Sequence, residues 1–183
     1  MASLLQSDEW AQFKRKYGWQ ARRVEGILIL SRKILFGKSL WYAPETDLVD
    51  GEQIRRLLAA IDGLARADHA FVFRLEVGVP HSQPLVDVLQ GLGFKKSFES
   101  VQPEWRAVVD IRSSEEQILS AMHQKGRYNT RVAERHGVAA GPSSNLDTFS
   151  RLYQETAKRD GFSPRGSEYF QDFLQMVPGA TLF

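Results

Sequence analysis

The fold class of this chain is indicated first by one segment, Ala70-Phe71-Val72-Phe73-Arg74-Leu75-Glu76. Its residues favour β-structure, and apolar and charged side chains alternate at its end, so it predicts a buried central strand. A helical apolar spacing covers residues 51–67 before it and residues 85–92 after it, where Gly93 suits a left-handed helix C-cap. A strand between two amphipathic helices indicates an α/β fold.

The segments before this strand predict a helix and three strands. Ser7 can N-cap a first helix that carries Trp10 and Phe13 on one face. Strands are then expected at residues 20–24, at residues 27–32 and at residues 39–42, the last of them stopping at Pro44.

The segments after the central strand predict a strand pair and then helices. The pair is expected at residues 94–101 and 106–111. A long helix follows from Ser113 to Gly137, with Ser113 and Glu116 spaced as a capping box. Two more helices are expected at residues 145–159 and 167–176. This order predicts a mixed central sheet flanked by helices.

The composition is that of an ordinary folded protein. Hydrophobic residues make up 43% of the 183, and a net charge of +2 excludes a strongly basic nucleic-acid scaffold but permits a local basic patch. The absence of cysteines excludes disulfide bonds and cysteine-ligated metals, and the histidines lack metal-ligand spacing. No signal peptide is visible, and the longest apolar run, residues 27–30, is too short to cross a bilayer. We therefore expect a cytoplasmic protein.

The last third of the chain predicts the start of a second domain. The length allows one domain plus part of another. Residues 176–183 have the pattern of a helix end, a turn and an opening strand, where a natural domain rarely stops. We therefore expect a first domain at residues 1–140, a linker and the beginning of a truncated second domain at residues 141–183. A docked C-terminal strand is the alternative.

A basic ridge is expected on the long helix, where three arginines recur at i, i+4 and i+8. With the side chains beside it, this basic ridge comprises Lys125, Arg127, Tyr128, Asn129, Arg131 and Arg135. Like charges at this spacing destabilise a bare helix by about 0.2–0.5 kcal/mol per pair, so acidic side chains or an anionic ligand must offset them. The neighbouring Glu134 favours a solvated face, whereas the tyrosine and asparagine add hydrogen-bonding groups that favour an anion site.

The turn Leu89-Gln90-Gly91-Leu92-Gly93-Phe94 and the element order resemble the GNAT acyltransferase fold. In an ordinary acetyltransferase, a glycine-rich loop after the central strand binds the pyrophosphate of coenzyme A. Val77-Gly78-Val79-Pro80 stands here instead, and Pro80 is poorly suited to a loop that donates backbone N–H groups.

A set of segments in the same order is similar to the FemAB family of peptidoglycan bridge-forming aminoacyltransferases, and the resemblance covers nearly the whole chain. The segments are Leu5-Gln6-Ser7 with Trp10 and Phe13, Gly37-Lys38-Ser39 with Tyr42-Ala43-Pro44, Phe73-Arg74-Leu75-Glu76, Leu92-Gly93-Phe94, Gln102-Pro103, Lys125-Gly126-Arg127-Tyr128-Asn129-Thr130-Arg131, and Tyr153-Gln154-Glu155-Thr156 with Arg159-Asp160-Gly161-Phe162.

The resemblance implies two GNAT-like domains in tandem, of which this chain carries the first and the start of the second. It implies transfer of an amino acid from aminoacyl-tRNA to the stem peptide of a UDP-muropeptide or of lipid II. It implies no metal or organic cofactor. We expect a monomer that meets the membrane only through a lipid-linked substrate, and a chain that is inactive alone because part of the catalytic cleft is missing.

Lys38 is the pyrophosphate ligand that the resemblance implies, because it lies where the family places a substrate lysine. A compact ammonium suits a phosphate. A solvated lysine between two strands is the alternative. The upstream glycine of a P-loop is missing before Gly37-Lys38-Ser39, so nucleotide hydrolysis is excluded.

Further substrate contacts are expected from Asp110, Trp105, Arg165 and Tyr169. The basic ridge is expected to hold tRNA phosphates or, as the alternative, the partner domain. Each has a structural alternative: Asp110 can support a helix N-terminus, Trp105 can pack in a core, and the other two can form an exposed pair. No catalytic base is assigned, since no carboxylate–histidine pair stands out.

Two other functions fit the same residues. One is a GNAT-like N-acyltransferase that uses coenzyme A, against which the missing pyrophosphate loop counts. The other is a non-catalytic module that binds a UDP-sugar or a nucleic acid through the basic ridge.

Overall fold

The computed structural model describes residues 3–103 and 105–183, which fall into two compact units. Of the described residues, unit 1 comprises 3–95 and 144–182, and unit 2 comprises 96–103, 105–143 and Phe183. The expected division into domains at residue 140 stays a prediction.

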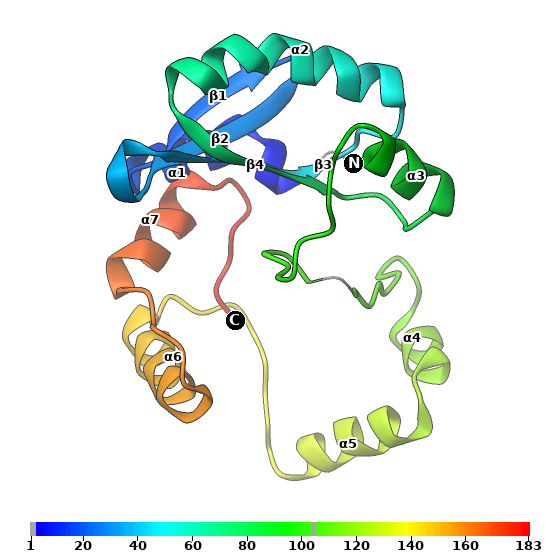
Figure 1. Ribbon diagram of the computed structural model, residues 1–183. Coiled ribbons are helices and arrows are strands. Elements are labelled where there is room, and N and C mark those ends of the chain that lie inside the picture. Colours follow the sequence, from blue (N-terminus) through cyan, green and yellow to red (C-terminus); the bar gives the residue numbers. More distant parts are fainter. Residues whose placement is uncertain (1–2, 104) are drawn as a thin grey trace. The chain divides into compact units, whose positions relative to one another are not determined.

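Unit 1 is built on a four-stranded mixed sheet in the order β1-β2-β3-β4 (Figure 1). The strands are β1 (Gln20–Val24), β2 (Ile27–Lys33), β3 (Ser39–Thr46) and β4 (Ala70–Val77). The first three are antiparallel neighbours, and β4 lies parallel to β3 because the helix α2 (Gly51–Ala67) crosses over between them. The expected α/β architecture, a mixed sheet flanked by helices, is confirmed.

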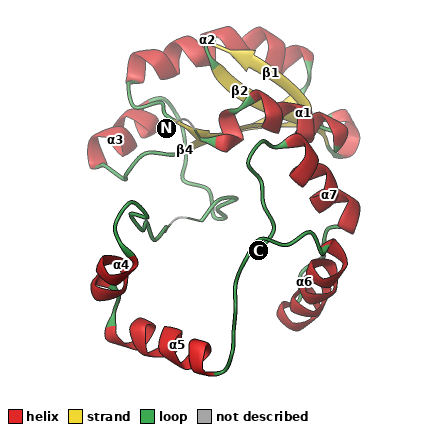
Figure 2. Ribbon diagram, turned by 180° about the vertical axis from the view of Figure 1, so that it is seen from behind, coloured by secondary structure: helices red, strands yellow, loops and turns green. Residues whose placement is uncertain are grey.

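Residues 27–30 of β2 are all apolar and buried, and successive side chains point to opposite faces of the sheet, so both faces are buried there. Ile27 and Ile29 belong to a core with α2 and with Leu85 of α3 (Gln83–Gly91). Leu28 and Leu30 point to the opposite face, toward Ala11 of α1 (Asp8–Lys16). The two helical layers lie on opposite sides of the sheet in Figure 2. A strand buried on both faces needs no polar alternation, as β2 shows.

Helix α1 begins at the predicted N-cap, since Ser7 Oγ accepts a hydrogen bond from the Trp10 N–H at 3.0 Å. Its fully buried Phe13 packs edge-on against α7 (Ser167–Met176), with 5.5 Å between the ring centroids of Phe13 and Phe173. Asp172 of α7 also accepts a hydrogen bond from Tyr17 at 2.6 Å. This contact brings the end of the chain against its beginning.

Helix α7 also packs against α6 (Leu146–Asp160) through aromatic rings. Phe170 meets the rings of Phe149 and Tyr153 at centroid distances of 4.8 and 5.0 Å. Gly161 ends α6 in the left-handed conformation, as glycine does at low cost. The strand expected after Pro178 is not formed, apart from a single bridge at Leu182.

Two expectations for the sheet are wrong. Strand β3 continues past Pro44 to Thr46, because Pro44 lies in a register irregularity where its missing N–H removes no ladder bond. Strand β4 is not central: among the described residues it pairs only with β3, and Phe71 is 73% exposed. No described strand pairs with the second edge of β4.

The strand pair expected at residues 94–101 and 106–111 is also wrong for the described part of these segments, which contains no strand. Phe98 and Val108 are more than nine-tenths exposed there. Their β-favouring pattern stabilises a strand only where a sheet or helix covers one face, and an isolated two-stranded hairpin is marginal in water.

The long helix expected in unit 2 is two helices, α4 (Glu115–Ala121) and α5 (Gln124–Arg135). Met122 is extended, and His123 N-caps α5 by accepting from the Lys125 N–H at 3.3 Å. The capping box at the start of α4 is formed by Ser114 and Gln117, one residue later than expected. A local side-chain acceptor therefore interrupts a continuous helical pattern.

Two 3-10 turns complete unit 1. The first, η1 (Leu4–Gln6), places the Gln6 amide oxygen 2.8 Å from the Leu28 N–H. The second, η2 (Leu35–Gly37), forms the tip of the loop between β2 and β3.

Candidate functional site

A lysine held between two tryptophans marks the candidate site in unit 1. Trp10 and Lys14 are one turn apart on α1, and Trp19 follows the left-handed Gly18 that turns the chain toward β1. Lys14 Nζ lies 5.3 Å from the ring centroid of Trp10 and 5.0 Å from that of Trp19. The indoles stabilise the ammonium by cation–π attraction and shield it from water.

Arg165 reaches the same region from the segment before α7. Its guanidinium carbon lies 5.2 Å from the ring centroid of Tyr169. Tyr169 itself is fixed by α1, with ring centroids 4.8 Å from Phe13 and 4.7 Å from Tyr17. The packing of α7 on α1 thus carries Arg165 toward Lys14.

Three positive charges act on one another at this place. Burial and, to a smaller extent, the charges of Arg165 and of Arg32 at the end of β2 together lower the pKa of Lys14 to about 8. None of the ion pairs between described residues includes one of these three side chains. We call Lys14, Arg32 and Arg165 the cationic cluster.

The cationic cluster has the chemistry of an anion site. A fold that keeps like charges together, with no ion pair to them among the described residues, gains stability when an anion neutralises them. The Nε1 of Trp10 is buried beside Lys14 and has no hydrogen-bond acceptor among the described residues. Two arginines and one ammonium suit the oxygens of a phosphate or pyrophosphate.

The sequence-based site residues of unit 1 are partly brought together. Arg165 and Tyr169 are in contact, and Tyr169 is a half-buried packing residue that positions the arginine. Lys38 lies exposed after η2, next to the start of β3, where Lys33 and Ser39 are register partners. Its role as pyrophosphate ligand stays a prediction.

The sequence-based site residues in the segment where a strand pair was expected are exposed. Asp110 accepts two hydrogen bonds from the Arg112 guanidinium, at 2.8 Å from Nε and 2.7 Å from Nη2, and these bonds lower the pKa of Asp110. Trp105 is 87% exposed and lies in no core. Their substrate contacts stay predictions.

The basic ridge lies on α5, and its members differ in what they bind. Arg127 Nη1 donates to the carbonyls of Ser120, at 3.1 Å, and of Met122, so it satisfies the end of α4. Arg131 and Lys125 are exposed, and Tyr128 is 60% exposed. The remaining two members, Asn129 and Arg135, also face solvent. The ridge is available to a polyanion, and its tRNA role stays a prediction.

Sequence reasoning missed Lys14, Arg32 and the two tryptophans around the lysine. The i, i+4 spacing of Trp10 and Lys14 was visible, but a tryptophan on the apolar face of a helix is typical of core packing. No local pattern connects Lys14 with Arg165, because only the contact between α1 and α7 brings them together.

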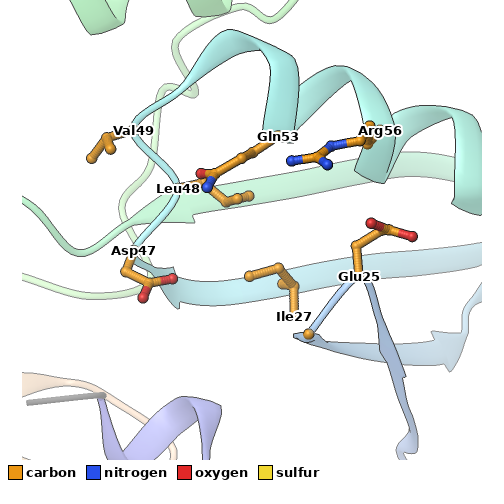
Figure 3. Close-up of a pocket in the computed structure, with 8 residues that line it drawn as sticks. Glu25, Ile27, Asp47, Leu48, Val49, Gln53 and Arg56 are labelled. Atoms are coloured by element: carbon orange, nitrogen blue, oxygen red, sulfur yellow. The ribbon is translucent and has the colours of Figure 1, made fainter.

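A separate hollow of about 400 Å³ lies at the other end of the sheet (Figure 3). Gln53 and Arg56 reach into it from α2, and Glu25 and Asp47 contribute carboxylates from loops. Its mixed charges select no particular ligand.

The described residues contain neither a metal-binding group nor a membrane-spanning helix. No group of three or more histidine or acidic side chains is placed to hold a metal ion. Within residues 3–103 and 105–183, no helix has the length and apolar character needed to cross a bilayer.

Two curated relatives of this chain carry the same name. The lipid II:glycine glycyltransferase of Staphylococcus aureus (strain MRSA252) is 28% identical over 198 residues, which cover 95% of this chain and 47% of the relative. The protein of the same name from strain USA300 matches equally well. The chain spans about half the length of the curated relatives it matches.

Structural comparison agrees. The crystal structure of FemX superposes with a TM-score of 0.73 and 26% identity, over 96% of this chain and 50% of that one. The model of the FemAB family matches residues 88–183, more than half of the sequence. The chain therefore belongs to the FemAB family.

Proposed function

We propose that the protein carrying this chain transfers an amino acid from aminoacyl-tRNA to the stem peptide of a peptidoglycan precursor, in crossbridge formation. The cationic cluster carries this proposal, because a UDP-muropeptide or lipid II presents a pyrophosphate that its three positively charged side chains would hold. The relatives named lipid II:glycine glycyltransferase support the same class of reaction and acceptor.

Each part of the chain has a role in this proposal. Lys14 and Arg165 grip the pyrophosphate, and Tyr169 positions Arg165. Lys38 would extend the grip from the loop after β2. The exposed members of the basic ridge in unit 2 hold tRNA phosphates, as sequence-independent contacts. Asp110 and Trp105 contribute further contacts to the acceptor.

The transfer reaction needs two further functions besides binding of the pyrophosphate. The attacking amine must lose a proton and the tetrahedral oxyanion must be stabilised. No described residue is assigned to either task, and we expect the stretch of 183 residues to be inactive alone. The reaction needs no organic cofactor, since the ester of aminoacyl-tRNA is already activated.

The test uses the full-length protein with Gly-, Ala- or Ser-charged tRNA and a UDP-muropeptide or lipid II. Mass spectrometry of the acceptor should show one added residue. Lys14→Met and Arg165→Gln should raise the KM for the acceptor, whereas Lys158→Met, an exposed lysine on α6, should not. Lys38→Ala tests the sequence-based assignment separately.

The outcomes separate the candidate functions. If no combination of charged tRNA and acceptor gives a mass gain although the muropeptide binds, the protein is a non-catalytic binding module. Acyl transfer from a coenzyme A thioester in place of tRNA would establish the N-acyltransferase alternative. If the Lys14 and Arg165 variants transfer the amino acid as well as the wild type, the proposed reaction stands but the assignment of its binding site is wrong.

A further inference from the structure

The loop between β2 and β3 presents three consecutive large apolar residues to solvent. Ile34 is 44% exposed, Leu35 77% and Phe36 96%. Loop tips are ordinarily polar, and a run of exposed apolar side chains marks an interaction site. We call residues 34–36 the apolar tip.

The conformation of the apolar tip is held by the backbone. The Ile34 N–H donates to the Lys38 carbonyl at 2.8 Å, and the Lys38 N–H donates to the Leu35 carbonyl at 3.3 Å. Phe36 adopts a φ of 57°, in the left-handed region that bulky residues rarely occupy. The loop is thus fixed in a form that projects Leu35 and Phe36 instead of folding them back onto the sheet.

A collar of positive charge surrounds the apolar tip. Arg32 and Lys33 precede it and Lys38 follows it. Lys33 is paired with Asp68 at 2.8 Å, whereas none of the ion pairs between described residues includes Arg32 or Lys38. An excess of positive charge therefore remains beside the exposed apolar side chains.

We propose that the apolar tip inserts into the surface of a bilayer that contains anionic lipids, with Arg32 and Lys38 against the headgroups. Apolar side chains ringed by cations match the two layers of such a surface, acyl chains below and anionic headgroups above. A patch of three residues is too small for a stable protein–protein interface, which needs some 20–30 residues a side. The membrane contact is made by the chain itself and requires no bound substrate.

This contact has a consequence for catalysis that rests on the proposed function. Arg32 belongs to both the cationic cluster and the collar, so an inserted tip holds the cluster near the headgroup layer. The pyrophosphate of a lipid-linked acceptor lies at that layer. Insertion would therefore favour lipid II over a soluble UDP-muropeptide.

The test is sedimentation of the full-length protein with phosphatidylcholine vesicles, with and without phosphatidylglycerol. Vesicles with phosphatidylglycerol should bind the protein, and added salt should weaken binding. The double substitution Leu35→Ser and Phe36→Ser should reduce partitioning at least about tenfold, because two large side chains no longer leave water. Val49→Ser is the matched control, since Val49 is 55% exposed but lies beyond the other end of β3.

The double variant should fold normally, because both side chains are exposed, and unchanged thermal unfolding would verify this. It should also retain transfer to a soluble UDP-muropeptide and lose transfer to lipid II in vesicles. Unchanged vesicle binding in the folded double variant, or no binding of the wild type to anionic vesicles, would overturn the proposal. So would self-association that the double variant abolishes, which would assign the tip to a second copy. If the protein transfers an amino acid to neither acceptor, the proposed function is refuted, and the vesicle measurement still decides whether the apolar tip binds membranes.

Discussion

Replacing Lys14 by methionine should stabilise the fold and weaken phosphate binding. Burial, Arg165 and Arg32 together lower the pKa of Lys14 from 10.5 to about 8. That fall corresponds to about 3.4 kcal/mol against the charged form, which solvent screening of a half-buried side chain reduces to about 1–2 kcal/mol. Methionine keeps the unbranched stem and packs its sulfur on the indoles, so Lys14→Met should raise the free energy of unfolding by about 1 kcal/mol at neutral pH.

The pH dependence of this gain has a defined sign. Between a pKa of about 8 in the folded protein and 10.5 in the unfolded chain, the unfolded state holds the Lys14 proton more tightly. The contribution of Lys14 to stability should therefore rise as the pH increases through this range. The advantage of Lys14→Met should shrink over the same interval.

Urea denaturation followed by circular dichroism, at neutral and alkaline pH, measures the stability difference. Calorimetric titration with a UDP-muropeptide measures affinity, which should fall at least about tenfold because a charge-assisted phosphate contact is lost. Lys158→Met should change neither quantity. Lower stability of Lys14→Met at neutral pH, or an unchanged affinity, would refute the assignment of the cationic cluster as an anion site.

Other perturbations test the remaining parts of the structure. Asp68→Asn should lower the free energy of unfolding by about 1–2 kcal/mol at neutral pH, because hydrogen bonds from Lys33 and Trp41 lower the pKa of Asp68 to about 2. Since this folded-state pKa is below the ordinary value of 3.8, the stability difference should vanish as the pH falls from about 4 to 2, as measured by urea denaturation. Phe13→Ala should destabilise unit 1 by about 3–5 kcal/mol in the same assay, since the ring is fully buried between α1 and α7; a cost below 1 kcal/mol would show that these helices do not pack. Arg131→Gln should weaken tRNA binding by the full-length protein and lower its salt slope by about 1, and a filter-binding slope equal to wild type would exclude phosphate contact.

Local patterns predicted the elements whose signals lie within a few residues. The apolar spacing after Asp50 gave the bounds of α2 as found, and Ser7 caps α1 as expected. The apolar run in β2 and the turn at Glu25-Gly26 predicted the first hairpin. Periodicity and capping succeed here because neighbouring residues alone determine them.

The two failures have different physical causes. Residues 94–111 have strand-forming side chains, but a strand exists only where a partner supplies hydrogen bonds and buries a face. The break between α4 and α5 came from His123, whose ring accepts a backbone N–H that the helix pattern would have used otherwise. Competition of this kind is invisible to apolar spacing.

The α/β class, the order and caps of the unit 1 elements and the resemblance to the FemAB family could all be predicted from the amino-acid sequence, because helical and strand periods are local properties. The place where the positive charges gather depends on tertiary contacts. Lys14 and Arg165 come together only through the aromatic packing of α7 on α1, and Arg32 joins them from the end of a strand. Electrostatic interaction depends on distance in space, and distance along the chain does not reveal it.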